Sequence, residues 1–95
     1  MDKISKQKLE HYFDVTRKAL KKAKHSCPAK THLRKVSEDF LSMAENYYKD
    51  AVHFYKKGDY VTAFAALNYS HGWLDAGARL GLFNVKHDSK LFTVD

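Results

Sequence analysis

The sequence is poor in cysteine, proline and glycine. Cys27 is the only cysteine in the 95 residues, which excludes an internal disulfide and any zinc or iron–sulfur site built from several cysteines. A single thiol fits a reducing cytosol, so we expect a cytoplasmic protein. Pro28 is the only proline and there are four glycines, so we expect few turns and few, long elements.

Long uncharged runs and enzyme motifs are also missing. The longest stretch without a charged residue, 60–74, is shorter than the roughly 18 to 20 apolar residues of a membrane-spanning helix. Charges begin at Asp2 and no apolar segment follows, so we expect neither a signal peptide nor a membrane span. There is no Walker loop, Rossmann glycine fingerprint, His-Glu-x-x-His motif or nucleophile elbow. We therefore expect no cofactor and no enzyme activity.

Three segments repeat apolar residues every three or four positions, the spacing of an amphipathic helix. The first covers residues 4–26 and ends before Pro28, because the residue before a proline avoids the helical conformation. The second covers residues 32–57, with Thr31 as its N-cap, and the third covers residues 60–80. The second helix carries a heptad-like apolar seam: Leu33, Val36, Phe40, Met43, Tyr47, Ala51 and Phe54.

The chain turns back between the second and third helices at Gly58 and Asp59. Glycine closes a helix C-terminus in the left-handed conformation, and aspartate is a good N-cap for the next helix. So short a connection makes the two helices antiparallel neighbours. We predict one all-α domain, an antiparallel up-and-down three-helix bundle, with a short extended C-terminal tail over residues 83–95 that lies on the bundle. Two apolar pieces around His87-Asp88-Ser89 could pair as a hairpin.

The third helix is the most apolar and is predicted to be the centre of the bundle. On a helical wheel its apolar residues form two stripes that together cover roughly 200°. The first stripe is Tyr60, Ala63, Leu67, Leu74 and Ala78, and the second is Ala66, Tyr69, Trp73, Ala76 and Leu80. Such a width predicts that this helix packs against both of the others.

A polar stripe on the same helix is the first candidate site: Asn68, His71, Asp75 and Arg79. Spacings of four place His71 beside Asp75 and Asp75 beside Arg79. Asp75 could orient His71 as a general base, with Arg79 binding an anion. The alternative is the solvated face that an amphipathic helix needs. Two ligands, His71 and Asp75, fall short of a metal site, so we expect no metal.

A basic cluster is the second candidate. Residues 17–35 contain eight basic residues and no acidic one, namely Arg17, Lys18, Lys21, Lys22, Lys24, Lys30, Arg34 and Lys35. Such a patch could bind the phosphates of a nucleic acid, although charge runs are usually solvated faces. No recognition helix, zinc finger or aromatic platform for single strands accompanies it.

The aromatic residues are the third candidate. At helical spacing they are normally core, but the wheel places Phe64 at the edge of the polar arc. An exposed phenylalanine there predicts a partner surface, for a protein partner or for a second copy in a homodimer.

Two stretches carry a family resemblance: EDFLSMAENYYKDA and FYKKGDYVTAFAALNYSHGWLDAGARLGLF. Together they resemble a family of small, chiefly archaeal proteins catalogued as a domain of unknown function, family 357. The resemblance implies a three-helix bundle in an archaeal cytoplasm, with no established activity and no catalytic residues to carry over. The helix pair also looks like HEPN-type hairpins, but the HEPN pattern of arginine followed after four to six residues by histidine is missing. Seven residues separate Arg79 from His87, and seven separate Arg17 from His25.

The sequence thus predicts a non-enzymatic helical interaction or adaptor module. The alternative is a nucleic-acid-associated protein that uses the basic cluster, and a third hypothesis is a small enzyme that uses His71 and Asp75.

Overall fold

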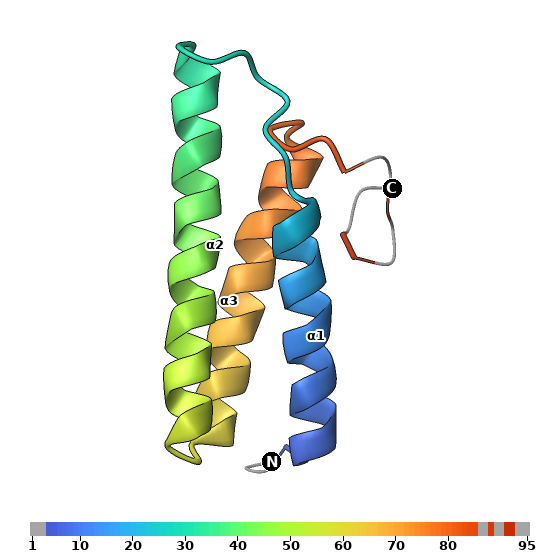
Figure 1. The fold of residues 1–95 in the computed structure, drawn as a ribbon, viewed down its shortest axis with the longest axis vertical. Coiled ribbons are helices and arrows are strands. Elements are labelled where there is room, and N and C mark those ends of the chain that lie inside the picture. Colours follow the sequence, from blue (N-terminus) through green and yellow to red (C-terminus); the bar gives the residue numbers. More distant parts are fainter. Residues whose placement is uncertain (1–3, 86–87, 89–90, 93–95) are drawn as a thin grey trace.

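The computed structural model describes residues 4–85, 88 and 91–92. Its helices α1 (Lys6–Lys22), α2 (His32–Lys56) and α3 (Tyr60–Arg79) run up, down and up (Figure 1). α3 packs against both other helices, whereas α1 and α2 contact each other little. The described residues contain no strand, so the predicted all-α three-helix bundle is confirmed. Within these ranges, no helix combines the length and the apolarity that a bilayer crossing needs.

α1 is shorter than predicted. It ends at Lys22, and the expectation that it continues to residue 26 is wrong. Residues 23–26 instead pair with the chain that follows α3 through two backbone hydrogen bonds, from Ser26 N–H to Leu82 O (3.0 Å) and from Asn84 N–H to Lys24 O (2.8 Å). Because another segment satisfies these backbone groups, they do not need a further helical turn.

The predicted helix signals around α2 and α3 are present. The Thr31 hydroxyl accepts a hydrogen bond from Arg34 N–H at 3.2 Å and so caps α2. Gly58 has a φ of 80°, the left-handed conformation that ends a helix. The Asp59 carboxylate accepts from Thr62 N–H at 3.2 Å and caps α3. This tight connection makes α2 and α3 an antiparallel pair (Figure 1).

Small buried residues repeat at heptad spacing on both α2 and α3. α2 buries Ser37, Ala44 and Ala51, and α3 buries Ala63, Ser70 and Gly77. The Ser70 hydroxyl donates to the Ala44 carbonyl oxygen at 2.7 Å, which fixes the register of the pair. Small side chains reduce the distance between helix axes, so the two backbones lie close together.

The second apolar stripe of α3 is mostly exposed, and the prediction that it is core is wrong. Tyr69 and Leu80 are 63% and 68% exposed, and Ala76 is exposed as well. α2 contacts α3 at Ser70, and α1 covers the neighbouring edge of α3 that carries Phe64. No described segment of the chain covers Tyr69, Ala76 and Leu80.

The chain after α3 lies on the bundle, as expected for the tail. Leu82, Phe83, Val85 and Phe92 are all buried. Lys22 of α1 holds Asp88 through an ion pair of 2.7 Å. The expected hairpin includes residues 87 and 89, which lie outside the described residues. Among the described residues, Phe92 N–H donates to the Asp88 carbonyl oxygen at 3.0 Å.

Candidate functional site

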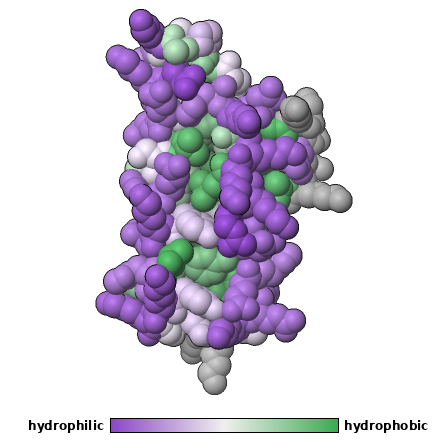
Figure 2. Space-filling view, in the orientation of Figure 1, coloured by the Kyte–Doolittle hydropathy of each residue, from purple (hydrophilic) through white to green (hydrophobic). Residues whose placement is uncertain are grey.

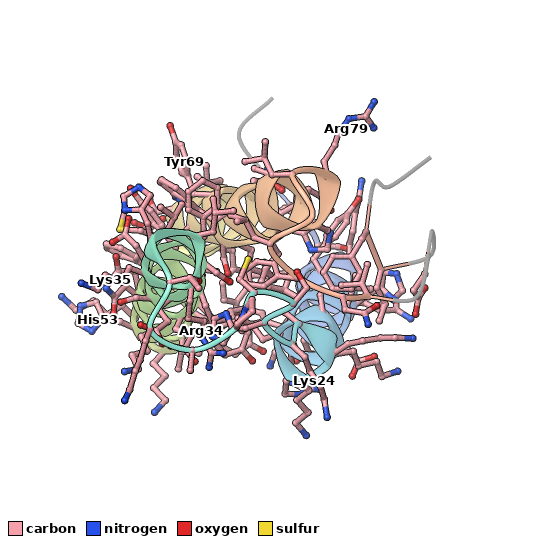
Figure 3. The ribbon with its side chains drawn as sticks, turned by 90° about the horizontal axis from the view of Figure 1, so that it is seen from above. Lys24, Arg34, Lys35, His53, Tyr69 and Arg79 are labelled. Atoms are coloured by element: carbon pink, nitrogen blue, oxygen red, sulfur yellow. The ribbon has the colours of Figure 1, made fainter. Side chains whose placement is uncertain are left out.

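The predicted polar stripe is divided in the structure. His71 Nε2 lies 3.5 Å from Asp75 Oδ1, and the two side chains are 25% and 27% exposed. Arg79 is exposed and points away from the bundle (Figure 3), while Asn68 borders a hollow between α2 and α3. The stripe therefore brings together only His71 and Asp75. In the described ranges, no group of three or more His, Cys, Asp or Glu residues could hold a metal ion.

Half of the predicted basic cluster is engaged in ion pairs. Arg17 and Lys18 contact Asp14 (2.7 and 2.9 Å), Lys22 contacts Asp88 (2.7 Å) and Arg34 contacts Glu38 (3.1 Å). The Lys18 ammonium, more than any other group, holds the pKa of the Asp14 carboxyl below its usual value. The other four residues are exposed and form no ion pair with described residues: Lys21, Lys24, Lys30 and Lys35. Lys24 and Lys35 point in different directions (Figure 3), so the cluster is not one continuous free surface.

Phe64 does not lie exposed at a polar edge. Its ring is half-buried and its centroid lies 5.1 Å from that of Tyr12 on α1. It also packs against the buried cluster that contains Leu9 and Phe13. The expectation of an exposed partner residue is therefore wrong, because α1 covers this edge of α3.

A groove runs between α1 and α2 where these helices contact each other little. It has a volume of about 370 Å³ and is lined by Glu10, Phe13, Arg17, Tyr48, Val52 and Tyr55. Figure 2 shows apolar side chains between hydrophilic rims on this face.

The polar groups of this groove bind one another. The Tyr55 hydroxyl donates to Glu10 Oε2 at 2.6 Å, and this bond to a carboxylate raises the pKa of Tyr55 to about 12. Arg17 donates to the Tyr48 hydroxyl at 3.5 Å and to Asp14 at 2.7 Å. Its apolar residues are half-buried or buried. The groove thus has few groups left to attract a ligand.

The more exposed apolar surface lies on the other side of α2 and α3. We call it the outer face and define it by nine residues: Leu33, Val36, Phe40, Tyr47, Tyr69, Gly72, Trp73, Ala76 and Leu80. Three of its large side chains are more than half exposed, Leu33 at 57%, Tyr69 at 63% and Leu80 at 68%. Figure 3 shows Tyr69 pointing away from the bundle on the side opposite Lys24. None of the nine residues carries a charge at neutral pH.

Aromatic pairs across α2 and α3 build the centre of the outer face. The rings of Tyr47 and Tyr69 stack with centroids 5.2 Å apart, and Phe40 meets Trp73 edge to face at 4.9 Å. A hollow of about 410 Å³ lies beside them, lined by Phe40, Asn68, Tyr69, Gly72, Trp73 and Ala76. The outer face therefore presents a projecting ring, Tyr69, next to an open depression over Gly72.

Gly72 is the one glycine whose presence the fold does not explain. Gly58 and Gly81 have φ values of 80° and 79°, which favour glycine. The Phe83 ring occupies the space that a Cβ atom on Gly77 would need. A Cβ atom on Gly72 would have no atom within 4 Å, although a glycine inside a helix costs about 1 kcal/mol relative to alanine. Gly72 thus leaves the hollow open but lowers the stability of α3 in the isolated chain.

Sequence reasoning missed the outer face because it assigned the same residues to the core. The apolar seam of α2 and the apolar arc of α3 together offer more apolar surface than three helices can cover, but the pattern does not say which part stays exposed. An excess of apolar stripes over available helices indicates an unpartnered face.

Fold and outer face together define a small all-α helical-bundle protein with an exposed apolar surface. The family model DUF357, described as a protein of unknown function, matches residues 11–83, and the chain belongs to this family. The match includes all of α2 and α3 and most of α1, so the family resemblance is confirmed. A search of curated proteins found no match to the chain, and a search of solved structures found none either.

Proposed function

We propose that this protein is a non-catalytic interaction module whose outer face binds another protein surface. The observation that carries the proposal is the hollow lined by Phe40, Gly72 and Trp73, beside the 63% exposed ring of Tyr69. Scattered single hydrophobic residues are ordinary on a protein surface, whereas a continuous apolar patch with aromatic anchors is typical of a binding site.

The arrangement of this face supports a protein partner. Tyrosine and tryptophan are enriched in binding hot spots because they bury a large area with few rotatable bonds. Here Tyr69 and Trp73 sit next to a hollow into which a partner side chain fits. A nucleic acid would require cationic groups beside the rings, and the nine residues of the outer face include none.

Nucleic-acid binding through residues 17–35 is less well supported than a protein partner. Four of the eight basic side chains already contact carboxylates, which reduces the charge available to phosphates. Lys24 and Lys35 also project in different directions.

Photo-crosslinking from a single position tests the proposal. Benzoylphenylalanine replaces Tyr69 in cells that make the protein, and the matched control carries it at Ser42, an exposed position of α2 outside the outer face. We expect a protein adduct from position 69, insensitive to nuclease, and none from position 42. The absence of an adduct at position 69, or its loss after nuclease treatment, would contradict the proposal.

A further inference from the structure

We infer that the occupant of the outer face is a second copy of this chain, with Tyr69 of each copy seated in the hollow over Gly72 of the other. This inference rests on the proposed function, because it names the partner of the same surface. Shape and the position of Gly72 each support it, and an interface without charged residues permits it.

Apolar contact, and not charge, would hold a partner on the outer face. The chain has a formal net charge of +6, yet the nine residues of the outer face carry none of it. An acidic partner would therefore find no lysine or arginine within this face to pair with. Lys24 points to the side opposite Tyr69, whereas Arg79 points to the same side as Tyr69 (Figure 3). Two copies that meet here therefore repel through their net charge and are held by apolar contact.

Shape makes the outer face complementary to itself. A two-fold dimer uses the same patch on both copies, so a projecting group and its receptor must both lie on that patch. Tyr69 projects at one edge of the hollow that it helps to line, and Gly72 lies three residues later, about 4.5 Å along the helix at 1.5 Å per residue. A two-fold axis that passes between these two positions places each tyrosine over the other copy's glycine.

Gly72 gains an explanation in this arrangement. In the isolated chain nothing prevents a larger residue at this position, and a larger residue would favour the helix. A side chain at position 72 would, however, occupy the hollow that receives the partner's ring. Close approach of another group is the usual reason for a glycine inside a regular element.

The size of the face indicates a weak dimer. From Leu33 to Tyr47 the face extends about 21 Å along α2, and it is two helices wide, with axes about 9 Å apart. The buried area is then on the order of 400 to 600 Å² per copy, below the roughly 800 Å² of a standard interface. We therefore expect a dimer that dissociates in the micromolar range.

Sedimentation velocity over a concentration series tests the inference. We expect the wild-type chain to show a monomer–dimer equilibrium, and Gly72→Gln and Tyr69→Ser each to weaken it about tenfold or more. Ser42→Gln is the matched control and should dimerise like the wild type. Circular-dichroism melting checks that Gly72→Gln folds; its melting temperature should be at least that of the wild type, because glutamine is the better helix former.

A wild-type chain that stays monomeric, or variants that dimerise as strongly as the wild type, would overturn the inference. The crosslinking experiment separates this failure from that of the proposed function. A monomeric chain whose position 69 still crosslinks to a different protein retains the interaction module but loses the second copy as its partner.

Discussion

The Cδ2 atom of Phe83 lies 2.6 Å from the position that a Cβ atom on Gly77 would occupy. Phe83 is only 3% exposed and belongs to the core cluster that joins the ends of α1 and α3 to the tail. Gly77→Ala must therefore displace a buried ring. We expect a net loss of about 1 to 2 kcal/mol in the free energy of unfolding, measured by urea denaturation, because overpacking outweighs the better helix propensity of alanine.

Gly72→Ala is the matched control, since it makes the same change on the same helix. No atom lies within 4 Å of the added methyl group, so we expect a gain of about 0.5 to 1 kcal/mol. Equal effects of the two substitutions would show that Phe83 does not constrain position 77.

The hydrogen bond from Ser70 to the Ala44 carbonyl oxygen supports the close packing of α2 and α3. Ser70 is fully buried, so Ser70→Val replaces its hydroxyl with a larger branched group between two close backbones. We expect a loss of about 1 to 3 kcal/mol in the free energy of unfolding, measured by chemical denaturation. Ser42→Val, on the exposed side of α2, should cost less than about 1 kcal/mol. A Ser70→Val variant as stable as this control would contradict the packing described.

The Tyr55–Glu10 hydrogen bond predicts a pH-dependent contribution to stability. The pKa of Tyr55 is raised to about 12 in the folded chain, above the value of about 10 of an unfolded tyrosine. The folded state thus binds this proton more tightly, so the contribution is complete below about pH 10 and is lost as the pH rises through 12.

Denaturation of the wild type and Tyr55→Phe at about pH 8 and about pH 11.5 measures this effect. The stability difference between the two proteins should shrink at the higher pH. In a spectrophotometric titration, Glu10→Gln should lower the pKa of Tyr55, because it removes the carboxylate that raises it. An unchanged titration in Glu10→Gln would rule out this cause.

Salt should have opposite effects on self-association and on nucleic-acid binding. Two copies with a formal charge of +6 each repel, so added salt should strengthen the dimer.

Binding of single- or double-stranded nucleic acid should instead weaken as salt is added. Because four of the basic residues in 17–35 already contact carboxylates, we expect a slope of no more than about four in a plot of log affinity against log salt. Fluorescence anisotropy measures it, and a slope near eight would show that the ion pairs open on binding.

Most of the fold could be predicted from local signals. Pro28, Thr31, Gly58 and Asp59 each act on the residues next to them, so the sequence locates the ends of α2 and the start of α3. The end of α1 could not be found in this way. Residues 23–26 leave the helix because they bond to Leu82 and Asn84, more than fifty positions away in the chain.

The candidate site could not be predicted, because a helical wheel finds apolar stripes but not which of them a neighbour covers. Phe64 was expected to be exposed and lies against Tyr12, while Tyr69 was expected to be buried and is 63% exposed. Both errors depend on where α1 sits around α3. That position depends on how the helices pack against one another, and the residues of the turns do not determine this packing.

The fluorescence of Trp73 tests the second-copy interface most directly, because this is the only tryptophan and it lines the hollow. We predict that its emission moves to longer wavelength as the wild-type chain is diluted through the micromolar range. The concentration at the midpoint of this change should fall as salt is added. The emission of Gly72→Gln should change with concentration only at about tenfold higher concentration or above. A wild-type emission that stays constant from about 0.1 µM to about 1 mM would contradict the interface.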